Sequence, residues 1–300
     1  MKNLNAYILL LLLIVLFSCK KDKGSGIANN KKYLVSFKLD GFKQQILASN
    51  NSKLNTNGVV SDTGSIKAMF DSIGYAVYTS GTGGKLINFR SFSTKSFTNS
   101  ITDSLLSGTY VIAFYAGQKG LVASPSAGVI SYPSNIWKDT YAKTVTVAIT
   151  DSNINQTITL ERIVADIQLD IKDPIPANAT SFVMTFSTIG VGSYSIFNSK
   201  AATQGALPDR TINIPASAIG KSDFKFDYIA LGTPTIVAFT LQGFAGGRLL
   251  AQQYFPNVSI QKNQQTIYTG NFFGGTDSNN NGFQASVNQV WNPTPTVVNF

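Results

Sequence analysis

Residues 163–172, IVADIQLDIK, decide the fold class of this 300-residue chain. Every second residue of the run, beginning with Ile163, is apolar, and the residues between them are mostly polar. A period of two is typical of a β-strand with one buried face. The sequence DPIP at residues 173–176 is expected to end the strand, because proline has no N–H to donate to a β-ladder. The run therefore predicts the opening strand of a β-domain.

Shorter runs of β-branched and aromatic residues recur along the chain between turns rich in glycine and asparagine. We find no convincing helical period after the amino-terminal segment. Residues 258–260 and 266–270 are expected to form a hairpin across Lys262 and Asn263. Further strands are predicted at residues 33–40, 75–78, 86–89, 107–116, 144–150, 182–186, 207–215, 236–241 and 249–255, with a last pair at 272–273 and 283–291.

These signals predict an all-β chain that folds as two tandem β-sandwich domains. We expect the first domain at residues 33–157 and the second at residues 158–300. The strand at 107–116 is apolar on both faces, so it is expected to lie in the centre of a sandwich.

The amino-terminal segment resembles a bacterial lipoprotein signal. Residues 7–17 are almost wholly apolar, follow Lys2, and are too few to span a bilayer. The sequence LFSC then places a small residue directly before Cys19, as in a lipobox. Cys19 is the only cysteine in the chain and has no intramolecular disulfide partner. An ordinary signal peptide and an uncut membrane anchor are the alternatives.

The lipobox interpretation predicts that residues 1–18 are removed and that Cys19 carries lipid at the outer membrane, on the cell surface. Residues 19–32 are polar and glycine-containing, which is typical of a flexible tether. Five lysines and one aspartate within residues 20–32 would draw this tether to anionic lipid head groups.

Composition excludes several classes of function. Charged residues make up 13 % of the chain, and the formal charge of +9 forms no arginine-rich stripe, so no nucleic-acid partner is expected. The chain has no histidine and a single glutamate, Glu161. Ser-His-Asp catalysis, Cys-His catalysis and histidine metal sites are therefore excluded. We expect no enzymatic activity and no cofactor.

Three groups of residues are weak site candidates. Asp166 and Asp170 share a strand face about 13 Å apart, too far for a retaining carboxylate pair, and we expect both to be solvated. Asp277, Asn279 and Asn281 follow the first half of a calcium loop, but its twelfth position lacks glutamate, so a polar hairpin tip is the preferred interpretation. A sugar-stacking platform is the alternative to a core position for Tyr75, Tyr78, Phe89, Phe92 and Phe97.

Two motifs carry a family resemblance. An R-x-V-A-x-I opening is formed by Arg162, Val164, Ala165 and Ile167, and an N-x-x-T-x-x-T/S-G close by Asn263, Thr266, Thr269 and Gly270. With LLSGTYVIAFYA in the first half, they resemble the fimbrillin superfamily of Bacteroidota, particularly its lipoprotein fimbrial anchors and minor subunits. The resemblance implies two transthyretin-like β-sandwiches that bind partner subunits by β-strand complementation.

In polymerising members of that superfamily, an arginine-specific protease removes the first strand. This chain has no arginine before Arg90, so the strand at 33–40 is expected to stay in place. The resemblance therefore implies an anchor, a terminator or another subunit that stays whole. Separately, the triplets DSI and DSL resemble the O-glycosylation motif of exported Bacteroidota proteins, which makes Ser72 and Ser104 candidate O-glycosylation sites.

We therefore expect a surface lipoprotein of an adhesive or fimbrial assembly, whose partners are other surface-protein subunits. The alternative is a lipid-anchored β-sandwich that binds glycan, which would depend on exposed tyrosines or on Trp137.

Overall fold

The computed structural model describes residues 31–43, 61–62, 69–187, 189–233, 235–274 and 283–288. Its regular structure is almost entirely β-strand, with short 3-10 turns at η1 (Pro125–Ala127), η2 (Pro133–Asn135) and η3 (Ala216–Ala218). In this described part, no helix is long and apolar enough to cross a membrane. The prediction of an all-β fold is confirmed.

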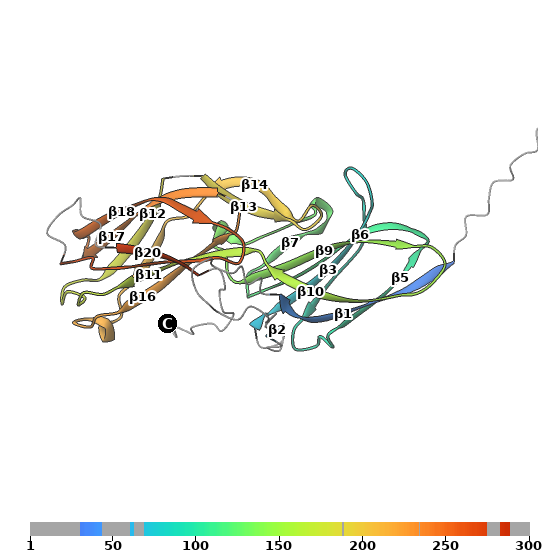
Figure 1. Ribbon diagram of the computed structural model, residues 1–300, viewed down its shortest axis with the longest axis horizontal. Helices are drawn as coiled ribbons and strands as arrows, with labels where there is room; N and C mark the ends of the chain where they lie inside the picture. The colour runs from blue at the N-terminus through green and yellow to red at the C-terminus, as the bar shows by residue number, and fades with distance from the viewer. Residues whose placement is uncertain are drawn as a thin grey trace, which may run out of the picture.

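The first half of the chain forms two packed β-layers, seen at the right of Figure 1. In one layer, the first strand lies between an antiparallel and a parallel neighbour. The ring of Phe37 lies 5.1 Å from that of Phe114 and 6.1 Å from that of Tyr75, so the layers share one core. The strands are β5 (Ser100–Leu106), β1 (Lys32–Lys43) and β10 (Ile154–Arg162) in one layer, and β9 (Thr140–Ile149), β6 (Gly108–Gly117), β3 (Ser72–Thr79) and β4 (Leu86–Ser93) in the other.

The strands β9 and β10 are consecutive and antiparallel, but they pair only where Glu161 meets Ala142 and Arg162 meets Tyr141. Beyond this point β10 pairs with β1 and β9 pairs with β6. The two strands therefore diverge into the two layers. A short strand, β2 (Ser61–Asp62), adds to the end of β1.

The second half also packs two sheets around one apolar core. Phe182 stacks on Phe226 of the facing sheet, with ring centroids 5.3 Å apart. One sheet contains β16 (Phe224–Leu231), β11 (Val164–Ile171), β19 (Gln265–Gly270) and β20 (Phe283–Asn288), and the other contains β15 (Arg210–Asn213), β12 (Ser181–Phe186), β17 (Thr235–Ala245) and β18 (Arg248–Ile260).

A separate four-stranded sheet joins the halves. Its strands are β7 (Val122–Ser124) and β8 (Val129–Ser131) from the first half, with β13 (Ile189–Ser195) and β14 (Lys200–Ala206) from the second. Side chains of β8 and β13 pack with Tyr78, Tyr115 and Ala142, which lie on the outer face of the β9-β6-β3 layer. Both faces of β6 are consequently buried, which confirms its predicted central position.

The structure corrects one predicted hairpin. β18 continues unbroken to Ile260 and pairs with β17 along its length. β19 pairs instead with β11 and β20, because residues 261–264 carry the chain across to the facing sheet.

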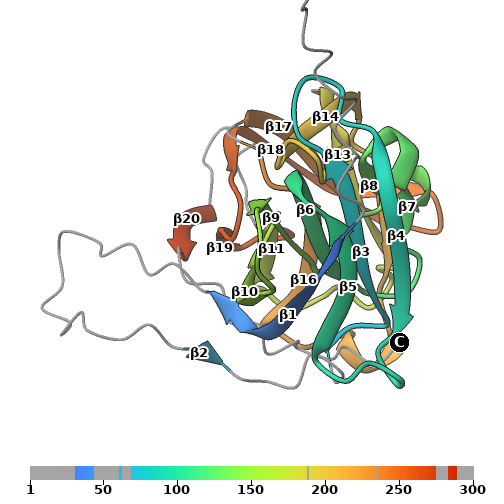
Figure 2. The ribbon, with the colours of Figure 1, turned by 90° about the vertical axis from the view of Figure 1, so that its right-hand side faces the viewer.

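The predicted domain boundary at residues 157 and 158 lies within β10, whose Ile158 and Leu160 pack in the first core. The division into two domains stays a prediction. Figure 2 shows how the first-half layers lie when seen from the right of Figure 1.

Candidate functional site

The outer edge of β10 is the first candidate. Over residues 154–160 it faces no partner strand in the part of the chain that the structure describes. Asn155, Gln156 and Thr157 are exposed there, and β10 contains neither lysine nor proline. Natural edge strands usually carry such residues to prevent pairing with another chain. We call residues 154–160 the β10 edge.

At the opposite side of the same sandwich, side chains join the edge strands β4 and β5. Arg90 of β4 donates from a terminal nitrogen to the carbonyl of Thr102 on β5, 2.8 Å away. The Oδ2 of Asp103 accepts hydrogen bonds from Tyr75 at 3.1 Å and from Asn88 at 2.8 Å. Burial, followed by the charge of Asp103, raises the pKa of Tyr75 above its usual range. The two edges at this side are thus linked to each other.

In the second half, β20 covers the outer edge of β19. The segment that leads from β19 towards β20 is held by Asp173, whose carboxylate accepts N–H groups of Phe272, Phe273 and Gly274 at 2.5 to 2.8 Å. Hydrogen bonds to an ionised carboxylate are among the strong ones in proteins. The loop that comes after β11 therefore fixes how the chain leaves β19.

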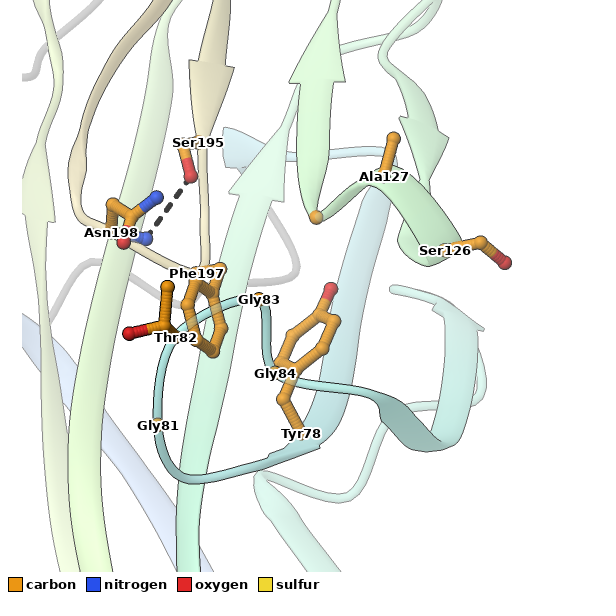
Figure 3. A pocket seen from close by; sticks show the side chains of 11 residues that line it. Tyr78, Gly81, Thr82, Gly83, Gly84, Ser126, Ala127, Ser195, Phe197 and Asn198 are labelled. Atoms are coloured by element: carbon orange, nitrogen blue, oxygen red, sulfur yellow. Dashed lines mark hydrogen bonds between the residues drawn. The ribbon is translucent and has the colours of Figure 1, made fainter.

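The second candidate is a concave hollow between the halves, with a volume of about 700 Å³ (Figure 3). Three short segments surround it: the β3–β4 turn, the η1 turn and the β13–β14 turn. We call it the junction hollow. Its lining residues are Tyr78, Gly81, Thr82, Gly83, Gly84, Ser126, Ala127, Gly128, Ser195, Phe197 and Asn198.

Two aromatic rings form the rigid part of the hollow. Phe197 lies edge-on to Tyr78, with ring centroids 5.4 Å apart, and the Tyr78 hydroxyl donates to the carbonyl of Pro125 at 2.9 Å. Burial raises the pKa of Tyr78 to about 12. Gly84 has to be glycine, because a Cβ there would lie 2.4 Å from the backbone carbonyl oxygen of Thr79 and 2.5 Å from the Phe197 ring.

A buried charge cluster lies where β10 passes into β11. Arg162 is 2 % exposed and binds both carboxylate oxygens of Asp139, at 2.8 and 3.0 Å. Its guanidinium lies 5.1 Å from the ring centre of Tyr141. Burial raises the pKa of Asp139, and Arg162 opposes that rise.

Asp166 and Asp170 are not solvated, contrary to our expectation, being 2 % and 5 % exposed. The neighbouring strands β16 and β19 place Ile229 and Gln265 directly beside Asp166. Asp166 accepts a hydrogen bond from Gln265, while Asp170 lies near Lys172 and Lys225. Burial, followed by the charge of Asp227, raises the pKa of Asp166 to about 8.

The core interpretation of the aromatic residues is confirmed for Tyr75, Tyr78 and Phe97, each at most 1 % exposed. Phe89 and Phe92 are partly buried. Trp137 is 1 % exposed, so the expectation that it stacks on glycan is wrong. A tryptophan in a polar stretch gave no local sign that it would pack in a core cluster, with its ring 5.4 Å from that of Tyr132.

The remaining predicted site residues fall into two groups. Cys19, Asp277, Asn279 and Asn281 lie outside the described residues. Among the described residues, no cluster of three or more acidic, cysteine or histidine side chains could hold a metal ion. Ser72 is partly buried at the start of β3, and Ser104 is exposed on β5. The O-glycosylation of these two serines stays a prediction.

Comparisons with protein-family models and with curated proteins find no match. Solved structures do match. The fimbrial anchor protein Mfa2 from Porphyromonas gingivalis aligns with a TM-score of 0.50 at 13 % identity, over 86 % of this chain and 98 % of Mfa2. The chain is similar in fold to a fimbrial anchor. A candidate cell adhesion protein from Parabacteroides distasonis also aligns with a TM-score of 0.50, at 11 % identity, over 85 % and 95 % of the two chains. The predicted resemblance to fimbrillin-type proteins is thus confirmed in the fold.

Proposed function

We propose that this chain is an anchor or minor subunit of a fimbrial or other adhesive assembly at the cell surface. The observation that carries the proposal is the fold that it shares with Mfa2 over 86 % of its length. The absence of histidine and of an acidic metal cluster in the described residues is consistent with a role in binding. Lipid on Cys19 holds the chain at the outer membrane in this proposal.

The β10 edge is the surface to which we assign the partner. A strand added at an exposed edge gains main-chain hydrogen bonds, and side-chain contacts then select the partner. The β10 edge has no partner strand among the described residues, and no side chain between residues 154 and 160 is charged. The opposite side of the sandwich is less suitable, because Arg90 already occupies a carbonyl of β5.

A pull-down of the intact lipoprotein from native membranes tests this assignment. Thr157→Lys places a charge on the β10 edge, and we expect it to abolish recovery of partner subunits and of fibre ladders. Thr102→Lys is the matched control, because Thr102 is an exposed threonine on the closed edge. Equal recovery with both variants would rule out the β10 edge, and wild-type protein that recovers no partner would rule out the assembly function.

The lipid anchor has a separate test. Metabolic labelling with a radioactive fatty acid should label the wild-type chain, and Cys19→Ala should abolish the label and release the protein from the membrane fraction. Labelling of Cys19→Ala, or an unlabelled wild-type chain, would contradict the anchor.

A further inference from the structure

The junction hollow has the shape of a ligand site. Its volume of about 700 Å³ lies within the range of small-molecule pockets, roughly 300 to 1,000 Å³. Segments from both halves build it: residues 81–84 and 126–128 from the first, and residues 195, 197 and 198 from the second. Sites that lie between two packed units are a common position for ligands.

Its chemistry is uncharged. None of its 11 lining residues is acidic or basic, although the chain contains 39 charged side chains. An ionic ligand would find no side chain of opposite charge to compensate its loss of water. Besides the Tyr78 hydroxyl, which already donates to Pro125, the polar side-chain groups are the hydroxyls of Thr82, Ser126 and Ser195 and the amide of Asn198. Hydroxyls and amides both donate and accept hydrogen bonds, which suits a ligand rich in neutral hydroxyl groups.

An aromatic ring lies beside these polar groups. Phe197 is partly exposed, so part of its ring is accessible from the hollow (Figure 3). A phenyl face binds the C–H face of a sugar ring in the way that it binds other apolar edges. A ring face next to hydroxyls and an amide complements a saccharide, which has both an apolar face and equatorial hydroxyls.

The hollow is also preorganised. Phe197 is held by Tyr78 and by the bare backbone of Gly84, and the Asn198 N–H donates to the Ser195 Oγ at 3.0 Å. β8 pairs with β13, and this pairing fixes the position of η1, which precedes β8, relative to the turn that follows β13. Little freedom of the Phe197 ring would be lost when a ligand binds, which favours affinity.

We propose that the junction hollow binds a neutral saccharide at the end of a glycan, with Phe197 as the stacking platform and Thr82 and Asn198 as hydrogen-bonding groups. This goes beyond the assembly function, because the hollow lies on the second-half side of the β9-β6-β3 layer, whereas the β10 edge belongs to the opposite layer. The proposal also gives a location to glycan binding, which is the alternative function that the sequence indicates.

Affinity electrophoresis of the mature chain tests the proposal, with α-mannan, laminarin and galactan as neutral probes and heparin as the charged probe. We expect at least one neutral probe to retard the protein. Phe197→Leu keeps apolar bulk against Tyr78 but removes the ring, and should weaken that binding about tenfold. Asn198→Ala, at an exposed position, should weaken it without lowering the melting temperature.

Tyr254→Ala is the matched control. Tyr254 is an exposed tyrosine on β18, 51 % accessible, and is an alternative platform among the residues that the structure describes. We expect its replacement to leave retardation unchanged. Loss of binding with Tyr254→Ala but not with Phe197→Leu or Asn198→Ala would overturn the proposal, as would retardation by heparin alone or by none of the probes.

Discussion

The two halves of the chain start from the same arrangement and finish it differently. In each half the first strand lies between an antiparallel and a parallel neighbour: β1 between β5 and β10, and β11 between β16 and β19. In the second half β20 then covers the outer edge of the parallel neighbour, whereas the corresponding edge of β10 has no partner among the described residues.

The polar faces of the two first strands differ as well. Leu34 and Lys38 of β1 are exposed, whereas Asp166 and Asp170 of β11 are buried. Within the described residues, the second half is therefore closed at the outer edge of β19 and on the polar face of β11, and the first half is open at the outer edge of β10 and on the polar face of β1. Equivalent strands in one chain can thus end in different surroundings, set by the strands that later pack beside them.

The largest expected effect tests whether the halves are separate units at all. Arg162→Met leaves the Asp139 carboxylate buried without its counter-charge, which should cost about 3–5 kcal/mol of unfolding free energy. Because Arg162 ends β10 directly before β11 begins, we expect one cooperative transition that shifts as a whole. Chemical denaturation followed by tryptophan fluorescence and by circular dichroism measures this.

The double variant Arg162→Met with Asp139→Asn is the control, since it removes both charges, and it should recover most of the lost stability. Two separate transitions, only one of which moves, would show instead that the halves unfold independently.

A smaller effect is expected from the segment that closes the second half. Asp173→Ala removes the acceptor of three N–H groups and should cost about 2–3 kcal/mol. Hydrogen exchange should show faster exchange of β20 and of the outward-facing amides of β19, which would then resemble those of β10. Asp209→Ala, at an exposed loop aspartate, is the control and should leave these amides protected. Unchanged exchange in Asp173→Ala would mean that β20 pairs without this support.

Strands with an alternating pattern could be predicted from the sequence, as for β1, β11 and β12. β13 and β14 could not, because their sequences, IGVGSYS and KAATQGA, are small and polar and become strands by pairing with each other and with β8. The continuity of β18 was missed for a related reason. Its Pro256 and Asn257 signal a turn, but in the structure they form a bulge, with Asn257 at φ 58°, and the pairing with β17 resumes at Val258.

The candidate sites depend even more on tertiary contacts. The junction hollow is assembled from turns at residues 81–84, 126–128 and 195–198, and no local pattern relates these turns to one another. The burial of Asp166 was equally hidden, since alternation identifies the face on which a residue lies but not what flanks that face. The contact of Arg90 with β5 could not be predicted either, because the sequence does not show that β4 and β5 lie side by side.

The smallest expected effect concerns the buried face of β11. The pKa of Asp166 is raised to about 8 from an ordinary value of 3.8, so between these two pH values the folded chain binds more protons than the unfolded chain. Stability from this group is therefore present at low pH and is lost as the pH rises towards 8. Asp166→Asn, which can still accept from Gln265, should be close to the wild type in stability near pH 5 and increasingly more stable than the wild type as the pH rises to 8.

Thermal denaturation at several pH values measures the stability of Asp166→Asn relative to the wild type. The groups around Asp166 are Asp227, Arg162 and Asp139, and Asp227→Asn should shift the same pH dependence to lower pH, because the neighbouring charge is then absent. Ser36→Asp on β1 is the counterpart in the first half, and since Ser36 lies on the open face, it should add no pH dependence in this range. A stability difference for Asp166→Asn that stays constant from pH 5 to pH 9 would mean that Asp166 is ionised throughout, and that the polar face of β11 is as accessible to water as that of β1.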